Sequence, residues 1–155
     1  MKAVAPTPLL LSAWLGAATL FSAVVAPAAF AALPSRTLAG ALVGRVLPVV
    51  FIAGIVVAAI SLGLDRPRRG RLAGVRRAAL LVIALACGAA QFYVGPRIDS
   101  VRRAIDGPIE QLAPTDERRV TFGRLHAVSV GWLGLAMIAA ATALVLASIP
   151  PKEQA

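Results

Sequence analysis

The sequence predicts an all-α integral membrane protein, a four-helix bundle with an amphipathic interfacial helix between its third and fourth spans. Four stretches carry no charged side chain: residues 3–35, 46–64, 78–96 and 125–151. A helix needs about 20 mostly apolar residues to cross a bilayer. Composition agrees, since 59% of the residues are hydrophobic, 15% are charged and the mean hydropathy is +0.82. Backbone groups in hydrocarbon must pair within their own segment, so each stretch is expected to be a helix.

We predict one transmembrane domain over residues 1–155, because no polar segment is long enough to fold alone. Its predicted spans are approximately 8–32, 40–64, 76–96 and 123–148, with an extramembrane amphipathic connection at 97–122. The first span also resembles a signal peptide, because Lys2 precedes an apolar run that ends near Ala29-Phe30-Ala31. The run at 9–26 exceeds the roughly 7–15 apolar residues of a signal peptide, so we expect a true span.

Arginine placement predicts the orientation. Six arginines lie within residues 66–77, between the second and third spans. Short loops rich in Lys and Arg stay in the cytoplasm. We therefore expect a multi-pass protein of the cell inner (plasma) membrane with cytoplasmic N and C termini.

The formal net charge of +9 would suggest a nucleic-acid partner if the chain were soluble. Here the basic residues sit between apolar stretches, so we expect the lipid bilayer as partner and no nucleic acid.

Small residues predict where helices approach one another. Gly40 and Gly44 form a GxxxG pattern at the start of the second span, and such patterns let helices pack closely in lipid. Small residues could pack against a second copy of the chain in the same way, so a homo-oligomer is also consistent with the sequence.

The connection at 97–122 carries apolar residues at spacings of three and four, which places them on one stripe of a helix. These residues are Ile98, Val101, Ile105, Ile109 and Leu112. The pattern predicts an amphipathic helix lying in the membrane interface, broken at Gly107-Pro108.

The candidate polar site lies at the membrane face opposite the arginine-rich loop. Successive spans cross the membrane in opposite directions, so the ends of the first and third spans and the starts of the second and fourth lie at this face. The residues placed there are Pro27, Arg97, Arg124, His126 and Ser129. His126 is the only histidine and lies three residues before Ser129, on the same helix face. Ionisable groups near the membrane interior favour a functional interpretation. The alternative is a histidine at headgroup level that only hydrogen-bonds a neighbouring loop, and the sequence leaves both open.

One histidine cannot build a bis-histidine haem site or a multi-histidine zinc site within one chain, so we expect no cofactor. Whether His126 contributes to a metal site is unknown from the sequence. We also expect no catalytic site, because His126 and Ser129 point the same way along one helix and a third member is missing. The remaining hypotheses are a small solute or metal handled at the candidate polar site, or a non-transport assembly, chaperone or stress-response factor. The ligand is unknown.

Several motifs resemble a known family. They are 25–30 (VAPAAF), 38–40 (LAG), 96–98 (PRI) and above all 122–129 (FGRLHAVS). Together they resemble a bacterial four-span family related to transmembrane protein 205, catalogued as a domain of unknown function, over about residues 14–144. The resemblance implies a compact four-helix membrane protein without an established activity. Family members often carry a polar residue shortly after the serine, where this chain has Gly131-Trp132-Leu133-Gly134.

Overall fold

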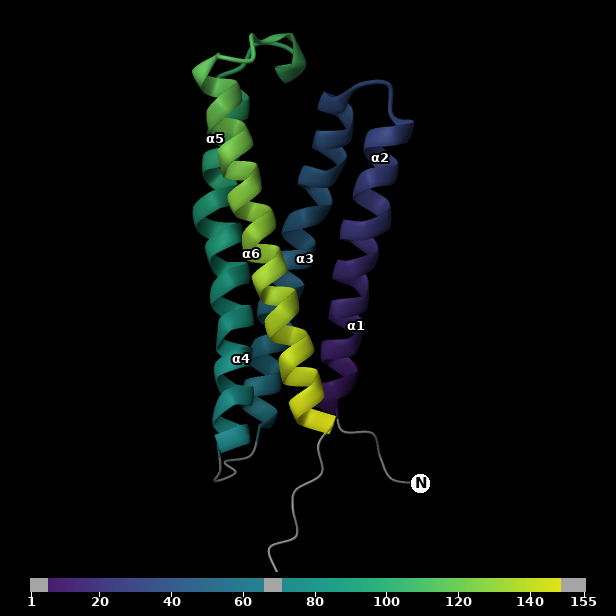
Figure 1. The fold of residues 1–155 in the computed structure, drawn as a ribbon, viewed down its shortest axis with the longest axis vertical. Helices are drawn as coiled ribbons and strands as arrows, with labels where there is room; N and C mark the ends of the chain where they lie inside the picture. The colour runs from purple at the N-terminus through teal and green to yellow at the C-terminus, as the bar shows by residue number, and fades with distance from the viewer. Residues whose placement is uncertain (1–5, 66–70, 149–155) are drawn as a thin grey trace, which may run out of the picture.

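The computed structural model describes residues 6–65 and 71–148, and over these residues the chain forms four long antiparallel helices (Figure 1). All four are long and apolar enough to cross a membrane. The predicted all-α class and the multi-pass membrane architecture are therefore confirmed. Lys2, Lys152 and the loop residues 66–70, which contributed to the predicted orientation, lie outside the described residues.

The first span consists of α1 (Pro6–Leu20), the π-helical turn η1 (Phe21–Val25) and α2 (Ala26–Ala32), and the second is α3 (Arg36–Leu64). The third consists of α4 (Arg71–Gly88), the π-helical turn η2 (Ala89–Val94) and α5 (Gly95–Arg103). A short 3₁₀ turn, η3 (Ile109–Gln111), precedes the fourth span, α6 (Glu117–Ser148). The 29 residues of α3 measure roughly 44 Å, against a hydrocarbon core of about 30 Å. The helix is therefore longer than the hydrocarbon core is thick.

Two prolines explain the π-helical turns. Pro27 and Pro96 each lie just after a π turn and are the second residues of the helical segments that follow. Proline lacks an N–H and its ring collides with the carbonyl four residues earlier. The wider turn avoids that collision: the Ala26 N–H donates to the carbonyl of Phe21, five residues back. Gly95 pairs in the same way, and the third span consequently continues past its predicted end at residue 96.

The separate interfacial helix expected within residues 97–122 is not confirmed. Its first part, α5, is a direct continuation of the third span. Residues 104–116, which we call the cap segment, contain only η3 and turns. Gly107 has a φ of +103°, which L side chains rarely adopt, and Pro108 follows without an N–H. A continuous helix cannot form across that pair.

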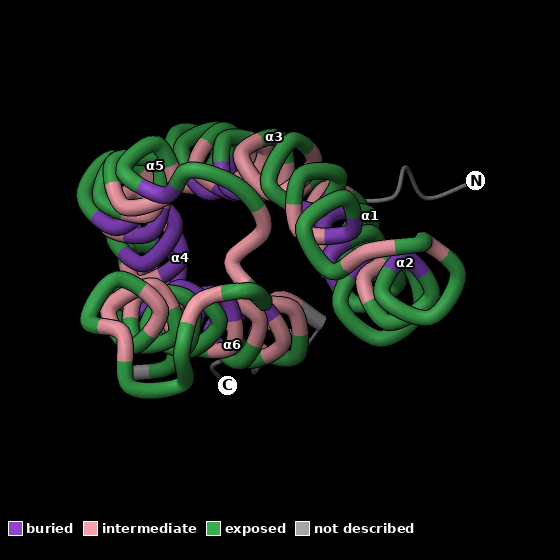
Figure 2. Tube along the Cα trace, turned by 90° about the horizontal axis from the view of Figure 1, so that it is seen from above, coloured by how far each residue is buried: buried purple, intermediate pink, exposed green. Residues whose placement is uncertain are grey.

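Small residues fill the core, and α4 and α6 pack together most closely. Buried positions face the centre of the bundle and exposed positions face outward (Figure 2). Large apolar side chains such as Leu85 and Ile138 are exposed, as expected for helices surrounded by lipid. In lipid the hydrophobic effect does not drive helices together, and van der Waals packing holds them instead. Small side chains such as alanine permit the close approach that this packing needs. The buried alanines include Ala18, Ala58, Ala79, Ala86, Ala90, Ala136, Ala140 and Ala143.

The tightest contact lies where α1, α3 and α4 meet. Trp14 of α1 donates its indole N–H to the Val50 carbonyl of α3 at 2.9 Å. One turn further along α3, a Cβ placed on Gly54 would lie 2.7 Å from the Cys87 sulfur and 2.9 Å from two atoms of the Trp14 ring. Only glycine fits this position without displacing a neighbour.

Asp65 joins the second and third spans at the end of the bundle opposite the cap segment. Its side chain is 4% exposed and forms ion pairs with Arg76 and Arg77 of α4. The Arg77 Nε lies 3.1 Å from Oδ2. These contacts hold the end of α3 against the beginning of α4.

Candidate functional site

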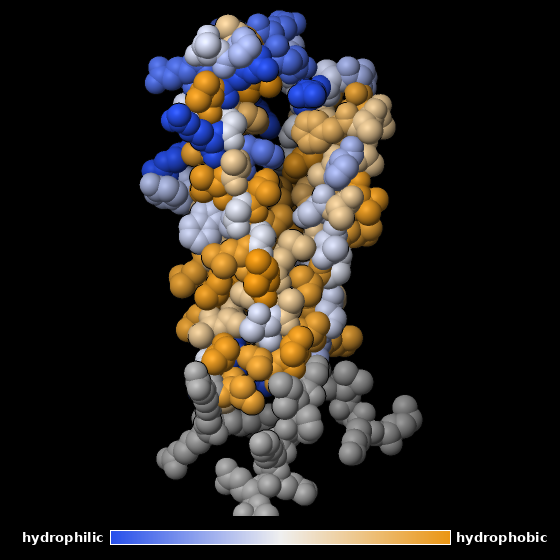
Figure 3. Space-filling view, in the orientation of Figure 1, coloured by the Kyte–Doolittle hydropathy of each residue, from blue (hydrophilic) through white to orange (hydrophobic). Residues whose placement is uncertain are grey.

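A cavity of about 470 Å³ lies beneath the cap segment, between the N-terminal half of α3, α5 and the start of α6. The surface is hollowed below the hydrophilic end of the molecule (Figure 3). The volume is within the roughly 300–1,000 Å³ typical of small-molecule sites. Its apolar wall consists of Phe30, Val43, Leu47, Ile98, Ile105, Ile109 and Phe122. Its polar side chains are those of Arg36, Thr37, Arg102, Glu110, Arg119, His126 and Ser129.

Gly40 and Gly44 line this cavity instead of meeting another helix backbone. The nearest atoms to a Cβ built at either position belong to the Arg102 guanidinium, at 3.6 Å for Gly40 and 3.1 Å for Gly44. The GxxxG pattern therefore makes room for a long side chain. The sequence alone predicted a helix–helix contact there.

Arg102 reaches across the cavity from α5. Its Nη2 donates to the Gly40 carbonyl at 3.3 Å, and its guanidinium carbon lies 5.7 Å from the centre of the Phe122 ring. Sequence reasoning missed this residue, although a signal was present. Residue 102 is four residues after Ile98 and three before Ile105, which is the spacing of residues on one face of a helix, and α5 brings Arg102 and Ile98 to one face. An arginine within an apolar stripe indicates a charge that faces the protein interior.

The cap segment is tied to helices on both sides of the cavity. The Thr37 hydroxyl of α3 donates to Glu110 Oε2 at 2.8 Å. Arg119 of α6 donates from Nη1 to the Leu112 carbonyl at 2.6 Å. The hydrogen bond from Thr37 lowers the pKa of Glu110, and nearby Arg36 adds to that effect. Glu110 is therefore ionised at neutral pH and holds the segment over the cavity.

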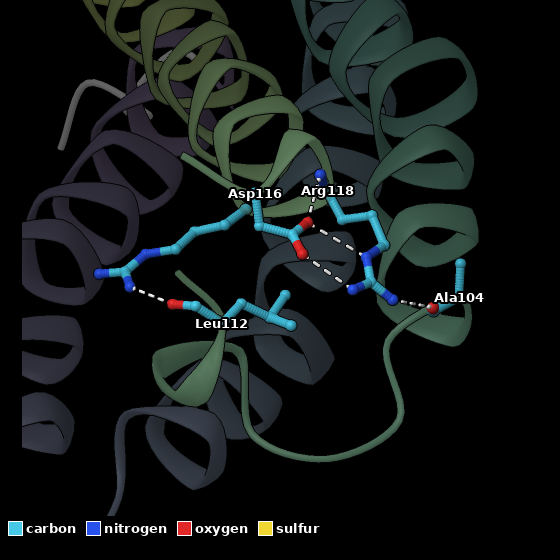
Figure 4. Close-up of polar contacts among 5 residues, drawn as sticks. Ala104, Leu112, Asp116 and Arg118 are labelled. Carbon is cyan, nitrogen blue, oxygen red and sulfur yellow. Dashed lines mark hydrogen bonds and ion pairs between the residues drawn. The ribbon is translucent and has the colours of Figure 1, made fainter. Parts of the chain in front are cut away.

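Asp116 fixes the junction between the cap segment and α6 (Figure 4). Its Oδ1 accepts from the Arg118 backbone N–H at 2.9 Å, as an N-cap carboxylate does. The Arg118 guanidinium donates to both carboxylate oxygens and to the Ala104 carbonyl, 3.3 Å away. These bonds from Arg118 lower the pKa of Asp116 to about 2. Arg118 thus joins the two ends of the cap segment.

Two of the five predicted site residues line the cavity. His126 lies nearly parallel to the Phe122 ring, with 6.3 Å between ring centres and 4° between planes. Ser129 is only 3% exposed. Within residues 6–65 and 71–148, no group hydrogen-bonds its hydroxyl. A hydroxyl that lines a cavity without a protein partner can hydrogen-bond a bound molecule.

Pro27, Arg97 and Arg124 are exposed and are not among the cavity-lining residues. The Arg97 guanidinium lies 3.4 Å above the Tyr93 ring and donates to the Tyr93 carbonyl at 2.8 Å. The five predicted residues therefore divide into two that line the cavity and three that do not.

In the part of the chain that the structure describes, no three His, Cys, Asp or Glu side chains lie close enough together to hold a metal ion. Three of the seven polar side chains that line the cavity are guanidinium groups, which are donors and not metal ligands.

The family described as a domain of unknown function, DUF4149, matches residues 9–106. The match covers the first three spans and the start of the cap segment, and it confirms the resemblance to a domain of unknown function. It ends before the motif at 122–129, which contributes His126 and Ser129. No curated protein and no solved structure matches the chain.

Proposed function

Because the chain belongs to the DUF4149 family and has the architecture of a multi-pass membrane protein, we propose that it binds a small solute beneath the cap segment. The observation that carries this proposal is the cavity of about 470 Å³. It combines an apolar wall with a small number of polar side chains, which is the usual composition of a small-molecule site.

The proposed activity is binding without chemistry. His126 offers a single imidazole, which alone is a poor metal site. The Ser129 hydroxyl has no hydrogen bond to His126 in the described residues, so the pair lacks the contact that activates a nucleophile. We therefore propose a solute rather than a metal as the ligand, and no catalytic step.

We further propose that the protein lies in the inner membrane with both termini in the cytoplasm, which places the cap segment on the opposite side. A membrane-impermeant maleimide added to intact cells should label Ala113→Cys in the cap segment. Ala73→Cys in α4 should react only after permeabilisation. Cys87 is buried and should give little background labelling. Labelling of Ala73→Cys from outside would reverse the orientation.

The binding proposal is tested by blocking the cavity. A leucine at position 44 would occupy the space that Arg102 now fills, since a Cβ there lies 3.1 Å from its Nη1. The matched control is Gly63→Leu on the same helix, where a Cβ meets nothing within 4 Å. Native mass spectrometry of the full chain in mild detergent should detect a small-molecule adduct on the wild type and Gly63→Leu, and none on Gly44→Leu.

An identical set of adducts on all three proteins would contradict solute binding. The alternative, a non-transport assembly, chaperone or stress-response factor, would then replace it. A homo-oligomer is not required by the proposal, because one chain supplies the whole cavity lining.

A further inference from the structure

The charges that line the cavity are unequal. Arg36, Arg102 and Arg119 face a single carboxylate, Glu110. Glu110 accepts from Thr37 and interacts electrostatically with Arg36, so its charge is already matched. No acidic side chain among residues 6–65 and 71–148 forms an ion pair with Arg102 or Arg119. The only hydrogen bonds of these two side chains in those residues go to backbone carbonyls.

Arg118 shows the contrast. It is one residue from Arg119, lies outside the cavity lining and has a carboxylate partner in Asp116. Inside the cavity, a backbone carbonyl occupies one donor of Arg102 and one of Arg119 and leaves their charges uncompensated. A guanidinium without a counterion is free to take one, and it is the side chain that best recognises carboxylate and phosphate through paired hydrogen bonds. The missing partner is therefore an anion.

The rest of the wall excludes a plain inorganic ion as the full occupant. Phe30, Val43, Leu47 and Ile98 line the same cavity. Its volume of about 470 Å³ corresponds to roughly sixteen waters at about 30 Å³ each, far more than one anion fills. Water against those side chains gains few hydrogen bonds, whereas an apolar group removes their surface from water. The Ser129 hydroxyl supplies one further polar contact.

We propose that the cavity binds an anionic amphiphile, a carboxylate or phosphate joined to an apolar group, with Arg102 as its principal anion contact. The proposal rests on the proposed function and assigns the class of its solute. The anion completes the pairing of Arg102 and Arg119, and the apolar group packs against α3 and α5. A free single-chain amphiphile and the headgroup end of an anionic lipid share this chemistry.

The test uses the full chain in phosphatidylcholine nanodiscs and isothermal titration calorimetry with three probes. Decanoate carries both features, decanol lacks the charge and inorganic phosphate lacks the apolar group. Decanoate should bind the wild type at least tenfold more tightly than either of the others. Arg102→Gln should weaken decanoate tenfold or more and leave decanol unchanged. Arg103→Gln, the exposed neighbour on α5 outside the cavity lining, is the matched control and should bind as the wild type does.

Arg102→Lys keeps the charge without the planar fork and should give intermediate decanoate affinity, which separates anion recognition from a folding defect. Replacing part of the phosphatidylcholine by phosphatidylglycerol distinguishes the sources. Weaker apparent decanoate binding to the wild type in those discs identifies a lipid headgroup as the ligand, and unchanged binding identifies a free amphiphile.

Equal affinity for decanoate and decanol, or full decanoate binding by Arg102→Gln, would overturn the anion proposal. Phosphate binding as tight as decanoate binding would overturn the proposal that the ligand carries an apolar group. In both cases solute binding stands if Gly44→Leu still abolishes the signal. If Gly44→Leu binds every probe as the wild type does, the proposed function fails as well.

Discussion

Replacing Gly54 by alanine should destabilise the bundle by about 1–3 kcal/mol relative to the same replacement at Gly63. The added methyl group at Gly54 would lie 2.7 Å from the Cys87 sulfur and 2.9 Å from two atoms of the Trp14 ring. Ordinary contacts begin at 3.4 Å, so these atoms are 0.5–0.7 Å too close. Trp14 is held by its hydrogen bond to Val50, and Cys87 is fully buried, so neither neighbour moves freely.

The control removes the contribution of backbone entropy. Gly63 lies on the same helix, and a Cβ there meets nothing within 4 Å. Alanine is favoured over glycine inside a helix by about 1 kcal/mol, and both variants receive that gain. The difference between them therefore reports only the crowding at Gly54. Gly63→Ala itself should be as stable as the wild type or slightly more stable.

The assay is unfolding in mixed micelles titrated with sodium dodecyl sulfate and followed by tryptophan fluorescence. Gly54→Ala should unfold at a lower detergent fraction than Gly63→Ala. Adding Cys87→Ala removes the closest clash, so the double variant should lose less stability than the sum of the single changes. Coincident unfolding curves for Gly54→Ala and Gly63→Ala would refute the close approach of α1, α3 and α4.

Three further outcomes are expected. Asp65→Asn leaves two arginines without their carboxylate and should cost about 3 kcal/mol in the same unfolding assay. Trp14→Phe removes the hydrogen bond to the Val50 carbonyl and should cost about 1 kcal/mol. Since the pKa of Asp116 is lowered from 3.8 to about 2, its ionised form stabilises the folded cap segment. That contribution is complete above about pH 5 and is lost as the pH falls through about 2. Protection factors for hydrogen exchange over residues 104–116, corrected for the intrinsic exchange rate at each pH, should therefore fall in acid, and Asp116→Asn should show the lower protection already at neutral pH.

Apolarity along the chain was sufficient to predict the four spans, because the bilayer selects on hydrophobicity and length. It did not predict where the helices end. The third span continues to Arg103 because the π turn at 89–94 accommodates Pro96. A sequence reading that treats proline as a helix terminator misses this adjustment.

The sequence predicted a candidate site that includes His126 and Ser129, and both residues line the cavity. Arg97 does not line the cavity and instead lies against the Tyr93 ring. The contact between Arg102 and Gly40 joins residues 62 positions apart, and no local pattern in a single sequence specifies such a pair.

The two π turns also determine the direction of two side chains that line the cavity. Each contributes one residue more than an α-helical turn, and one residue corresponds to about 100° of rotation around a helix. Phe30 lies beyond η1 and Arg102 beyond η2, so both owe their direction to that extra residue. Deleting one residue from 21–25 would turn Phe30 by about 100° away from the cavity while leaving α1 in place. The same deletion within 89–94 would turn Arg102 away from Gly40. The extra residue of each π turn thus rotates the helix that follows it, and this rotation directs Phe30 and Arg102 into the same cavity.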